Sequence, residues 1–347
     1  MLPALRRLVY RLVIGAACLS PLLAQASAPG TLASEQTRYI ATQFPGRMAG
    51  SPAEMLSAEY LRQKFAAWGY QSDVRTFKGR YIYTARSGTT SWHNYTGSMV
   101  LAAHEGKMPQ QIIVMAHLDT YAPQSDKDTN ANLGGLTLQG VDDNAAGVGV
   151  MMELAERLKD IKTQYSIRFI ATSAADIGQR GAENIVARMS EAERKNTLLV
   201  INLNHLIIGH KLWFNSGLST PAPIRKLTRD KALSLAKTHG IAAGTNPGHN
   251  PQYPKGTGCC NDAAVFDNAG IPVLSVESLD WERGLQDSNG TGYPVSAVLP
   301  KGSNAHSTSI DNQQYLDSHL PGRIETRSRD TVRILLPLLE NLAKAHH

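Results

Sequence analysis

Four short apolar runs constrain the fold of this 347-residue chain more than any other feature. They cover residues 111–116, 167–172, 198–203 and 271–276. Each is apolar at successive positions, so both faces of the strand would be buried, as in a sheet covered by helices on both sides. Helical patterns accompany the runs, at residues 144–160, 182–194, 222–239, 262–268 and 328–345. The alternation predicts an α/β fold, a three-layer sandwich with a mixed but mainly parallel central sheet.

An additional amphipathic helix is predicted at residues 52–68. Ser51 and Glu54 have the spacing of a capping box, Pro52 stands at the first helical position, and apolar residues then recur on one helical face. The chain contains no internal repeat, low-complexity tract or obvious linker. Residues 27–347 are therefore expected to form one domain.

The first 26 residues have the features of a signal peptide. Three arginines precede an apolar stretch from Leu12 to Leu23, and Ala24-Gln25-Ala26 fits a small-x-small cleavage site. A membrane anchor is the alternative, but the apolar stretch is shorter than the roughly 18 residues that span a bilayer, and Pro21 interrupts it. We expect a periplasmic or secreted protein with no stable membrane anchor after cleavage.

The charge and cysteine content exclude two classes of protein. The full chain carries a formal charge of +6, from 35 basic and 29 acidic side chains, and removal of the three N-terminal arginines leaves 32 basic side chains and a charge of +3. That balance predicts no nucleic-acid partner. Cys259 and Cys260 are the only cysteines after residue 26, too few for a disulfide framework or a structural zinc site. They would form either a vicinal disulfide or two thiols.

Polar residues gather where the predicted strands end. His117 and Asp119 follow the first run, Ser173–Gly178 follow the second, and Asn204 follows the third, while the segment Gly140–Gly147 (GVDDNAAG) opens a helix. Asp and Asn at a helix start also have a structural explanation, because they cap exposed N–H groups. That explanation fits a His followed two residues later by an Asp less well. Several such residues at neighbouring strand ends favour a metal site.

These motifs, together with a late His306, resemble the co-catalytic zinc aminopeptidase family in their order and spacing. The resemblance covers essentially the whole chain after the signal segment. Further motifs resemble a narrower group, the alkaline phosphatase isozyme conversion aminopeptidases of enteric bacteria: Phe44–Arg47, Tyr81–Arg86, Lys255–Asp262 and Leu320–Arg323.

The resemblance implies a site with two zinc ions that hydrolyses N-terminal peptide bonds. His117 and the residue at 204 would bind the first ion, the residue at 176 and His306 the second, and Asp142 would bridge both. Asp119 would orient His117, and the peptide bond between Asp142 and Asp143 would be cis. In the family, zinc activates water and polarises the scissile carbonyl, while a glutamate transfers the proton.

Three positions depart from the family pattern. The general base and the following ligand are both glutamates in the family, but here these positions hold Ala175 and Asp176. Alanine cannot accept a proton, and an aspartate oxygen falls short of the glutamate position by about 1.5 Å. The ligand expected as aspartate at 204 is the neutral Asn204. With two carboxylates in place of three, one zinc ion or none is expected.

No other residue is predicted to replace the missing base. His205 follows Asn204, but strand alternation would point it to the opposite face. Glu183 is interpreted as a first-turn carboxylate of a helix. Asp176 could act as the base only by leaving the metal.

Two functions follow from this pattern. The first is an impaired aminopeptidase acting on a peptide or protein N-terminus, with alkaline phosphatase as the substrate that the narrower resemblance implies. The second is a catalytically inactive pseudopeptidase that binds peptides or proteins. The replacements at 175 and 204 favour the second, whereas the presence of His117, Asp142 and His306 favours the first, because an abandoned site should drift at every position.

Overall fold

The computed structural model of the protein describes residues 27–258, 261–279, 281–283 and 304–346. The predicted signal segment and the cysteine pair at 259–260 lie outside these residues. Within the described part, no helix has both the length and the apolar character needed to cross a membrane.

The core of the fold is an eight-stranded mixed sheet. Its centre is formed by four parallel strands in the order β5, β3, β6, β9, and antiparallel strands flank this centre on both sides. Across the sheet the strands are β1 (Gln71–Thr84), β2 (Thr90–His104), β5 (Tyr165–Thr172), β3 (Met108–His117), β6 (Thr197–Leu203), β9 (Val273–Glu277), β7 (Leu212–Ser216) and β8 (Ala243–Gly244). All four predicted runs are strands of the parallel centre. A second, two-stranded sheet joins β4 (Lys162–Thr163) to β10 (Ala345–His346).

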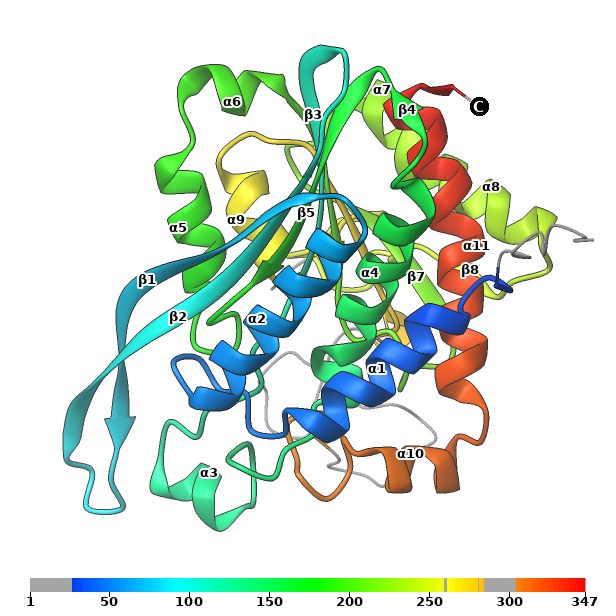
Figure 1. Ribbon diagram of the computed structural model, residues 1–347. Coiled ribbons are helices and arrows are strands. Elements are labelled where there is room, and N and C mark those ends of the chain that lie inside the picture. The colour runs from blue at the N-terminus through cyan, green and yellow to red at the C-terminus, as the bar shows by residue number, and fades with distance from the viewer. Residues whose placement is uncertain (1–26, 259–260, 280, 284–303, 347) are drawn as a thin grey trace, which may run out of the picture.

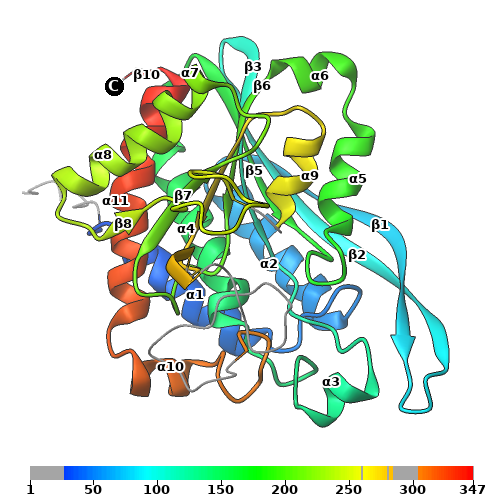
Figure 2. The same ribbon diagram turned by 180° about the vertical axis from the view of Figure 1, so that it is seen from behind.

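Helices cover both faces of the sheet, as expected for a three-layer sandwich (Figures 1 and 2). Successive side chains of β3 alternate between the layers: Ile112 and Val114 pack into one core cluster, and Ile113 and Met115 into another. The first cluster includes residues of α1 (Thr31–Gln43), α2 (Pro52–Ala67), α4 (Ala146–Leu158), α8 (Lys231–Thr238) and α11 (Arg323–Ala343). The second includes residues of α5 (Arg180–Arg188) and α9 (Asp262–Asn268).

Helix boundaries differ from the predicted ones where a cap intervenes. The predicted helix at 182–194 is two helices, α5 and α6 (Glu191–Asn196), because Ser190 forms a capping box with Glu193. The predicted helix at 222–239 comprises α7 (Ala222–Arg225), the π-helical turn η2 (Lys226–Asp230) and α8. Short elements complete the described chain: α3 (Asp126–Asn130), η1 (Val141–Ala145), η3 (Trp281–Arg283) and α10 (Gln313–His319).

The ribbon formed by β1 and β2 was not predicted from the apolar pattern. The two strands pair along their whole length, but β2 joins β5 only through residues 100–104. The rest of the ribbon extends from the body of the molecule, as Figure 1 shows on its left side. Most side chains in that part are at least partly exposed, so the segment lacks the apolar run of a central strand.

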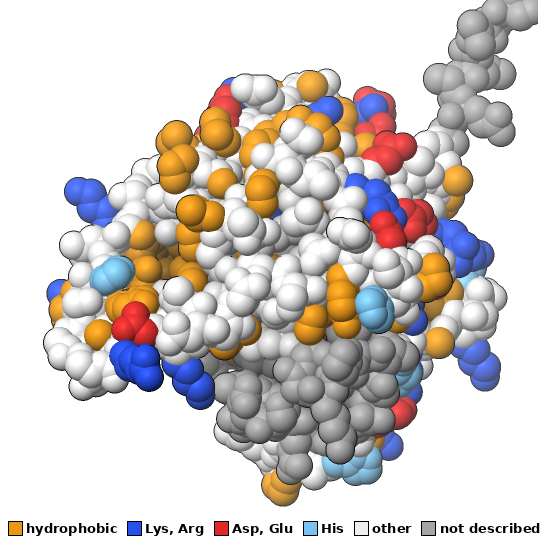
Figure 3. Space-filling view, turned by 90° about the horizontal axis from the view of Figure 1, so that it is seen from below, with side chains coloured by type: hydrophobic (Ala, Val, Ile, Leu, Met, Phe, Trp, Pro, Cys, Tyr) orange, Lys and Arg blue, Asp and Glu red, His pale blue; other side chains and the backbone are white. Residues whose placement is uncertain are grey.

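Surface charge is mixed on the face seen from below in Figure 1. Figure 3 shows Lys and Arg side chains interspersed with Asp and Glu side chains among the described residues of that face. The small net charge predicted from the sequence is therefore not gathered into a single-sign patch there.

Glu54 connects the start of α2 to the sheet. Ser51 caps the helix by accepting from the Glu54 N–H, as the sequence predicts, but the Glu54 carboxylate turns inward. It accepts hydrogen bonds from Gly50 N at 2.7 Å, from Ser98 N at 3.3 Å and from the Ser173 hydroxyl. Glu54 thus holds the loop after β5, and its burial, together with the charge of Asp119, raises its pKa to about 8.

We predict that Glu54 makes stability fall as pH rises. Its pKa is higher in the folded chain than in the unfolded one, so the native state holds an extra proton between about pH 4.5 and about pH 8. Stability conferred by this proton is present below that window and is lost as pH rises through it, with a slope of up to about 1.4 kcal/mol per pH unit. The Glu54→Gln variant should therefore show a shallower decline in urea unfolding experiments across this window. Glu35→Gln, on the exposed side of α1, should retain the wild-type slope, and equal slopes for all three proteins would contradict this role.

Candidate metal centre

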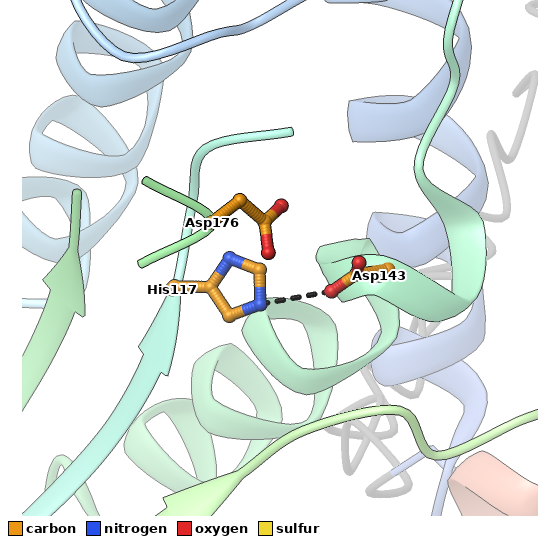
Figure 4. A group of neighbouring side chains, drawn as sticks. All are labelled: His117, Asp143 and Asp176. Atoms are coloured by element: carbon orange, nitrogen blue, oxygen red, sulfur yellow. Dashed lines mark ion pairs between the residues drawn. The ribbon is translucent and has the colours of Figure 1, made fainter. Parts of the chain in front are cut away.

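The candidate site lies where the carboxyl ends of the central strands meet, the usual place for a site in an open α/β sheet. His117 is the last residue of β3, the loop from Ser173 follows β5, and Asn204 follows β6. Asp143 comes from η1, and His306 from the segment before α10. Figure 4 shows the side chains of His117, Asp143 and Asp176 directed toward one another.

Asp143 is the centre of the arrangement. Its Oδ1 lies 3.0 Å from His117 Nε2, and its Oδ2 lies 2.8 Å from His306 Nδ1. His117 Nε2 also lies 3.0 Å from Asn204 Oδ1. His117, Asp143 and Asp176 each offer a ligand atom, and these three atoms all lie within 4.8 Å of one another. The structure thus brings together the predicted residues at 117, 176, 204 and 306.

Asp142 does not occupy the bridging position that the family resemblance implied for it. Its Oδ1 accepts hydrogen bonds from Ile207 N at 2.7 Å and Ile208 N at 3.0 Å, and its Oδ2 lies 3.0 Å from His205 Nδ1. This carboxylate therefore holds the loop after β6, and Asp143 faces the cluster instead. The cis peptide bond is likewise one residue later than expected, between Asp143 and Asn144. Asp142 and Asp143 are consecutive and fit the motif equally well. The sequence therefore could not show which of the two faces the cluster.

His205 is the residue that sequence reasoning missed. Strand alternation was expected to turn it away, but β6 ends at Leu203, and His205 adopts a left-handed backbone conformation with φ of 46°. Its ring is buried, and Nε2 lies 3.5 Å from Asp143 Oδ1. Three imidazoles therefore surround the Asp143 carboxylate. Alternation applies only within a strand, so no rule based on residue parity could place His205.

Asp119 connects His117 to the loop that carries the altered positions. His117 Nδ1 lies 3.0 Å from the Asp119 carbonyl oxygen and 3.5 Å from its Oδ1, so both groups can orient the ring. The Asp119 carboxylate also accepts long hydrogen bonds from the backbone N–H groups of Ala175 and Asp176, at 3.2 and 3.3 Å. The backbone of this loop is thus held without help from the side chain at 175.

The loop carries the carboxylate of Asp176 and, at 175, only the methyl side chain of an alanine. Asp176 Oδ2 is buried and has no hydrogen-bond partner among the described residues. Ala175 contributes no atom that could accept a proton. Glu183 lies in the first turn of α5, as predicted, and pairs with Arg180 at 2.8 Å on the surface. In this loop, Asp176 is therefore the residue with a buried carboxylate oxygen that lacks a hydrogen-bond partner among the described residues.

The charges of the site are mutually compensating. Burial alone would raise the pKa of Asp143, but the neighbouring charge of His205 and the contacts of His117 and His306 hold it well below its usual range. In return the acidic neighbours raise the pKa of His205 to about 10, against the effect of burial. Burial and the nearby charge of Asp143 raise the pKa of Asp176 to about 7. A divalent cation beside these carboxylates would lower both of their pKa values.

Arg47 supplies a permanent positive charge beneath the site. It is fully buried and donates to the carbonyl oxygens of Leu118 at 2.7 Å, Gln139 at 2.6 Å and Gly140 at 2.8 Å. These contacts fix the chain segments that carry Asp119 and Asp143. Asp311, also buried, accepts from the backbone N–H groups of Asp142 and Asp143 at 2.7 and 3.0 Å.

The residues present fit a zinc ion. Imidazole nitrogens and carboxylate oxygens are the donors that zinc takes in catalytic sites. Asp176 has a carboxylate oxygen within 4.8 Å of the ligand atoms of His117 and Asp143, and its buried Oδ2 has no hydrogen-bond partner among the described residues, so a cation would give this carboxylate a partner. Asn204 offers only a neutral oxygen, which weakens the case for a second ion.

Comparisons with known proteins show the family of this chain. Residues 99–330 match Peptidase family M28. The chain belongs to this family. It is 61% identical to the alkaline phosphatase isozyme conversion protein of Escherichia coli (strain K12), and the match covers 99% of this chain and 100% of that protein.

Solved structures support the fold. A zinc aminopeptidase from Bacillus subtilis superimposes with a TM-score of 0.64 at 14% identity, covering 91% of this chain and 95% of that one. A glutaminyl cyclase from Porphyromonas gingivalis superimposes with a TM-score of 0.61 at 16% identity, covering 90% and 98%. The fold therefore carries more than one chemistry, and the reaction has to be argued from the site residues.

We predict that Asp143 and Asp142 contribute very differently to zinc binding. Asp143→Asn removes the central charge and should lower zinc affinity by about 100-fold or more, whereas Asp142→Asn keeps an oxygen for the backbone N–H groups and should lower it by about tenfold or less. Competition with a chromophoric chelator measures both affinities, and thermal unfolding checks that both variants fold. A larger loss in Asp142→Asn than in Asp143→Asn would restore the original assignment.

Proposed function

We propose that this M28 protein is an exported zinc-dependent aminopeptidase with a weakened site, which binds peptide N-termini, holds fewer than two zinc ions and cleaves slowly. The observation that carries the proposal is the pair Ala175 and Asp176 in the loop after β5, a methyl group and one carboxylate whose buried Oδ2 has no hydrogen-bond partner among the described residues. Family membership supplies the reaction class. Ala175 and Asp176 stand where the family has glutamates, and this is why we expect weak zinc binding and slow cleavage.

His117, Asp143 and Asp176 are the residues that would hold a zinc ion, with His306 and His205 beside Asp143. When bound, zinc would polarise the scissile carbonyl and make water more acidic. Asp119 orients the His117 ring, and Arg47 holds the segments on which Asp119 and Asp143 stand.

Proton transfer is the step for which this chain is poorly equipped. A general base must lie within hydrogen-bond reach of the water that it deprotonates, and Ala175 offers no acceptor. Asp176 can serve as a metal ligand or as the general base. In the first case the site lacks a base, and in the second it lacks a metal ligand. Loss of the base alone lowers the rate by about 10²–10⁴.

A pseudopeptidase that only binds peptides or proteins is the second candidate. The absence of any acceptor at Ala175 favours it. The two candidates predict different behaviour of the purified protein, because slow hydrolysis scales with bound zinc whereas simple binding does not.

Metal content and turnover test the proposal directly. The purified mature chain should contain fewer than two zinc ions by elemental analysis and should cleave aminoacyl reporters slowly, at a rate that chelation abolishes. Two tightly bound zinc ions together with ordinary turnover would contradict the weakened site. Zinc-independent peptide binding with no turnover would favour the pseudopeptidase.

Restoring the altered positions provides the matched comparison. The triple variant Ala175→Glu, Asp176→Glu and Asn204→Asp should bind a second zinc ion and gain at least about 10²-fold in turnover, since the base is returned. Ala175→Gln has a similar length but cannot take up a proton, so it should give no gain. Unchanged turnover in the triple variant would mean that the defect lies elsewhere in the pocket.

Export and trimming of alkaline phosphatase form the finer part of the proposal. The N-terminal segment up to Ala26 supports export, and the name of the Escherichia coli relative supports the substrate. We predict that the periplasmic protein begins just after Ala26, and that alkaline phosphatase produced with it slowly loses N-terminal residues. Intact-mass spectrometry measures the mass of each protein and so locates both N-termini. Retention of residues 1–26 would exclude signal cleavage, and an unchanged alkaline phosphatase N-terminus would exclude that substrate.

A further inference from the structure

A second concave surface lies between the β1–β2 ribbon and α5. It is a groove of about 470 Å³, within the usual range for ligand sites of about 300–1,000 Å³. The ribbon contributes residues 77–80 together with Trp92 and Tyr95, and α5 contributes one helical face. None of the residues placed in the candidate metal centre lines this groove, so it is a separate surface.

The rim of the groove is basic. Lys78, Arg80 and Arg180 are exposed lining residues, and Glu183 is the acidic residue among those that line it. Glu183 is already paired with Arg180 at 2.8 Å, which leaves Lys78 and Arg80 as an excess of positive charge. The Arg80 guanidinium lies 4.2 Å from the centre of the Trp92 ring, so an aromatic surface holds this charge at the groove.

The walls indicate an occupant larger than a simple anion. Phe77 and the Tyr95 ring pack edge to face, and Trp92 is 55% exposed, so the groove offers apolar and aromatic surface as well as charge. β1 is also one of the two edge strands of the sheet, and such a strand can pair with an added extended chain. A polypeptide with acidic and apolar side chains combines carboxylates, backbone groups and apolar surface in one ligand.

We propose that the groove between the β1–β2 ribbon and α5 binds an extended acidic segment of a protein partner. Arg80 and Lys78 face its carboxylates, and the exposed ring of Trp92 contacts its apolar side chains. This binding does not depend on whether the metal centre cleaves peptides, because it uses none of the same residues.

Fluorescence anisotropy on the mature full-length chain tests the proposal. The probe is a short glutamate-rich peptide with a central Tyr-Leu pair, labelled with fluorescein and acetylated at its N-terminus so that it cannot act as an aminopeptidase substrate. The acidic peptide should bind at least about tenfold more tightly than the same peptide with each Glu replaced by Gln. The difference should shrink as salt is added.

Point variants locate the binding. Arg80→Glu should weaken it about tenfold or more, and Trp92→Ala, which removes the exposed aromatic ring, should weaken it about threefold to tenfold. Lys237→Glu, an equal charge change on the exposed side of α8, is the matched control and should bind as the wild type does. Thermal unfolding confirms that each variant folds.

Three results would overturn the proposal. The first is equal binding of the acidic and the neutral peptide. The second is an equal loss in Arg80→Glu and Lys237→Glu, which would indicate a general charge effect. The third is displacement of the peptide by a single-stranded oligonucleotide of the same charge at the same concentration as unlabelled peptide, which would indicate a site for any polyanion.

Discussion

The site depends on the charge of one buried carboxylate, that of Asp143. A lone ionised group at this depth would be strongly destabilising, and here His117, His205 and His306 surround it. Asp119, Arg47 and Asp311 then fix the segments that carry these residues. The sheet brings the strand ends together, but it is this compensation of charge that allows so many ionisable groups to share one buried place.

Sequence patterns predicted the parts of the fold that depend on burial. The runs at 111–116 and 198–203 are central strands because apolar residues on both faces leave few alternatives. The β1–β2 ribbon was not predicted, because its outer part is held by strand pairing within the ribbon and is too little buried to require an apolar run. The break between α5 and α6 was likewise missed, since the apolar period continues across Ser190 although a capping box starts a new helix there.

The site was predictable at the level of motifs and not at the level of single residues. His117, Asp176, Asn204 and His306 converge as the motifs implied, because the carboxyl ends of neighbouring parallel strands share one edge. The choice between Asp142 and Asp143 depends on the path of a tight turn, and both residues donate a backbone N–H to Asp311. The position of His205 depends on one left-handed residue after the strand end. Neither feature can be recognised from the hydropathy or the spacing of residues in the sequence.

The structure also offers a second explanation for the retention of His117 and His306. From the sequence alone, the presence of His117 and His306 indicates retained catalysis, because an abandoned site should drift at every position. The contacts supply a different reason for their survival. Removing either imidazole would leave Asp143 less compensated, and breaking a buried ion pair costs about 3–5 kcal/mol. The side chain at 175 has no such role, since Asp119 holds the loop through backbone N–H groups. A base can therefore be lost without cost to folding while the ligands around it are retained, so an intact cluster is not by itself a measure of activity.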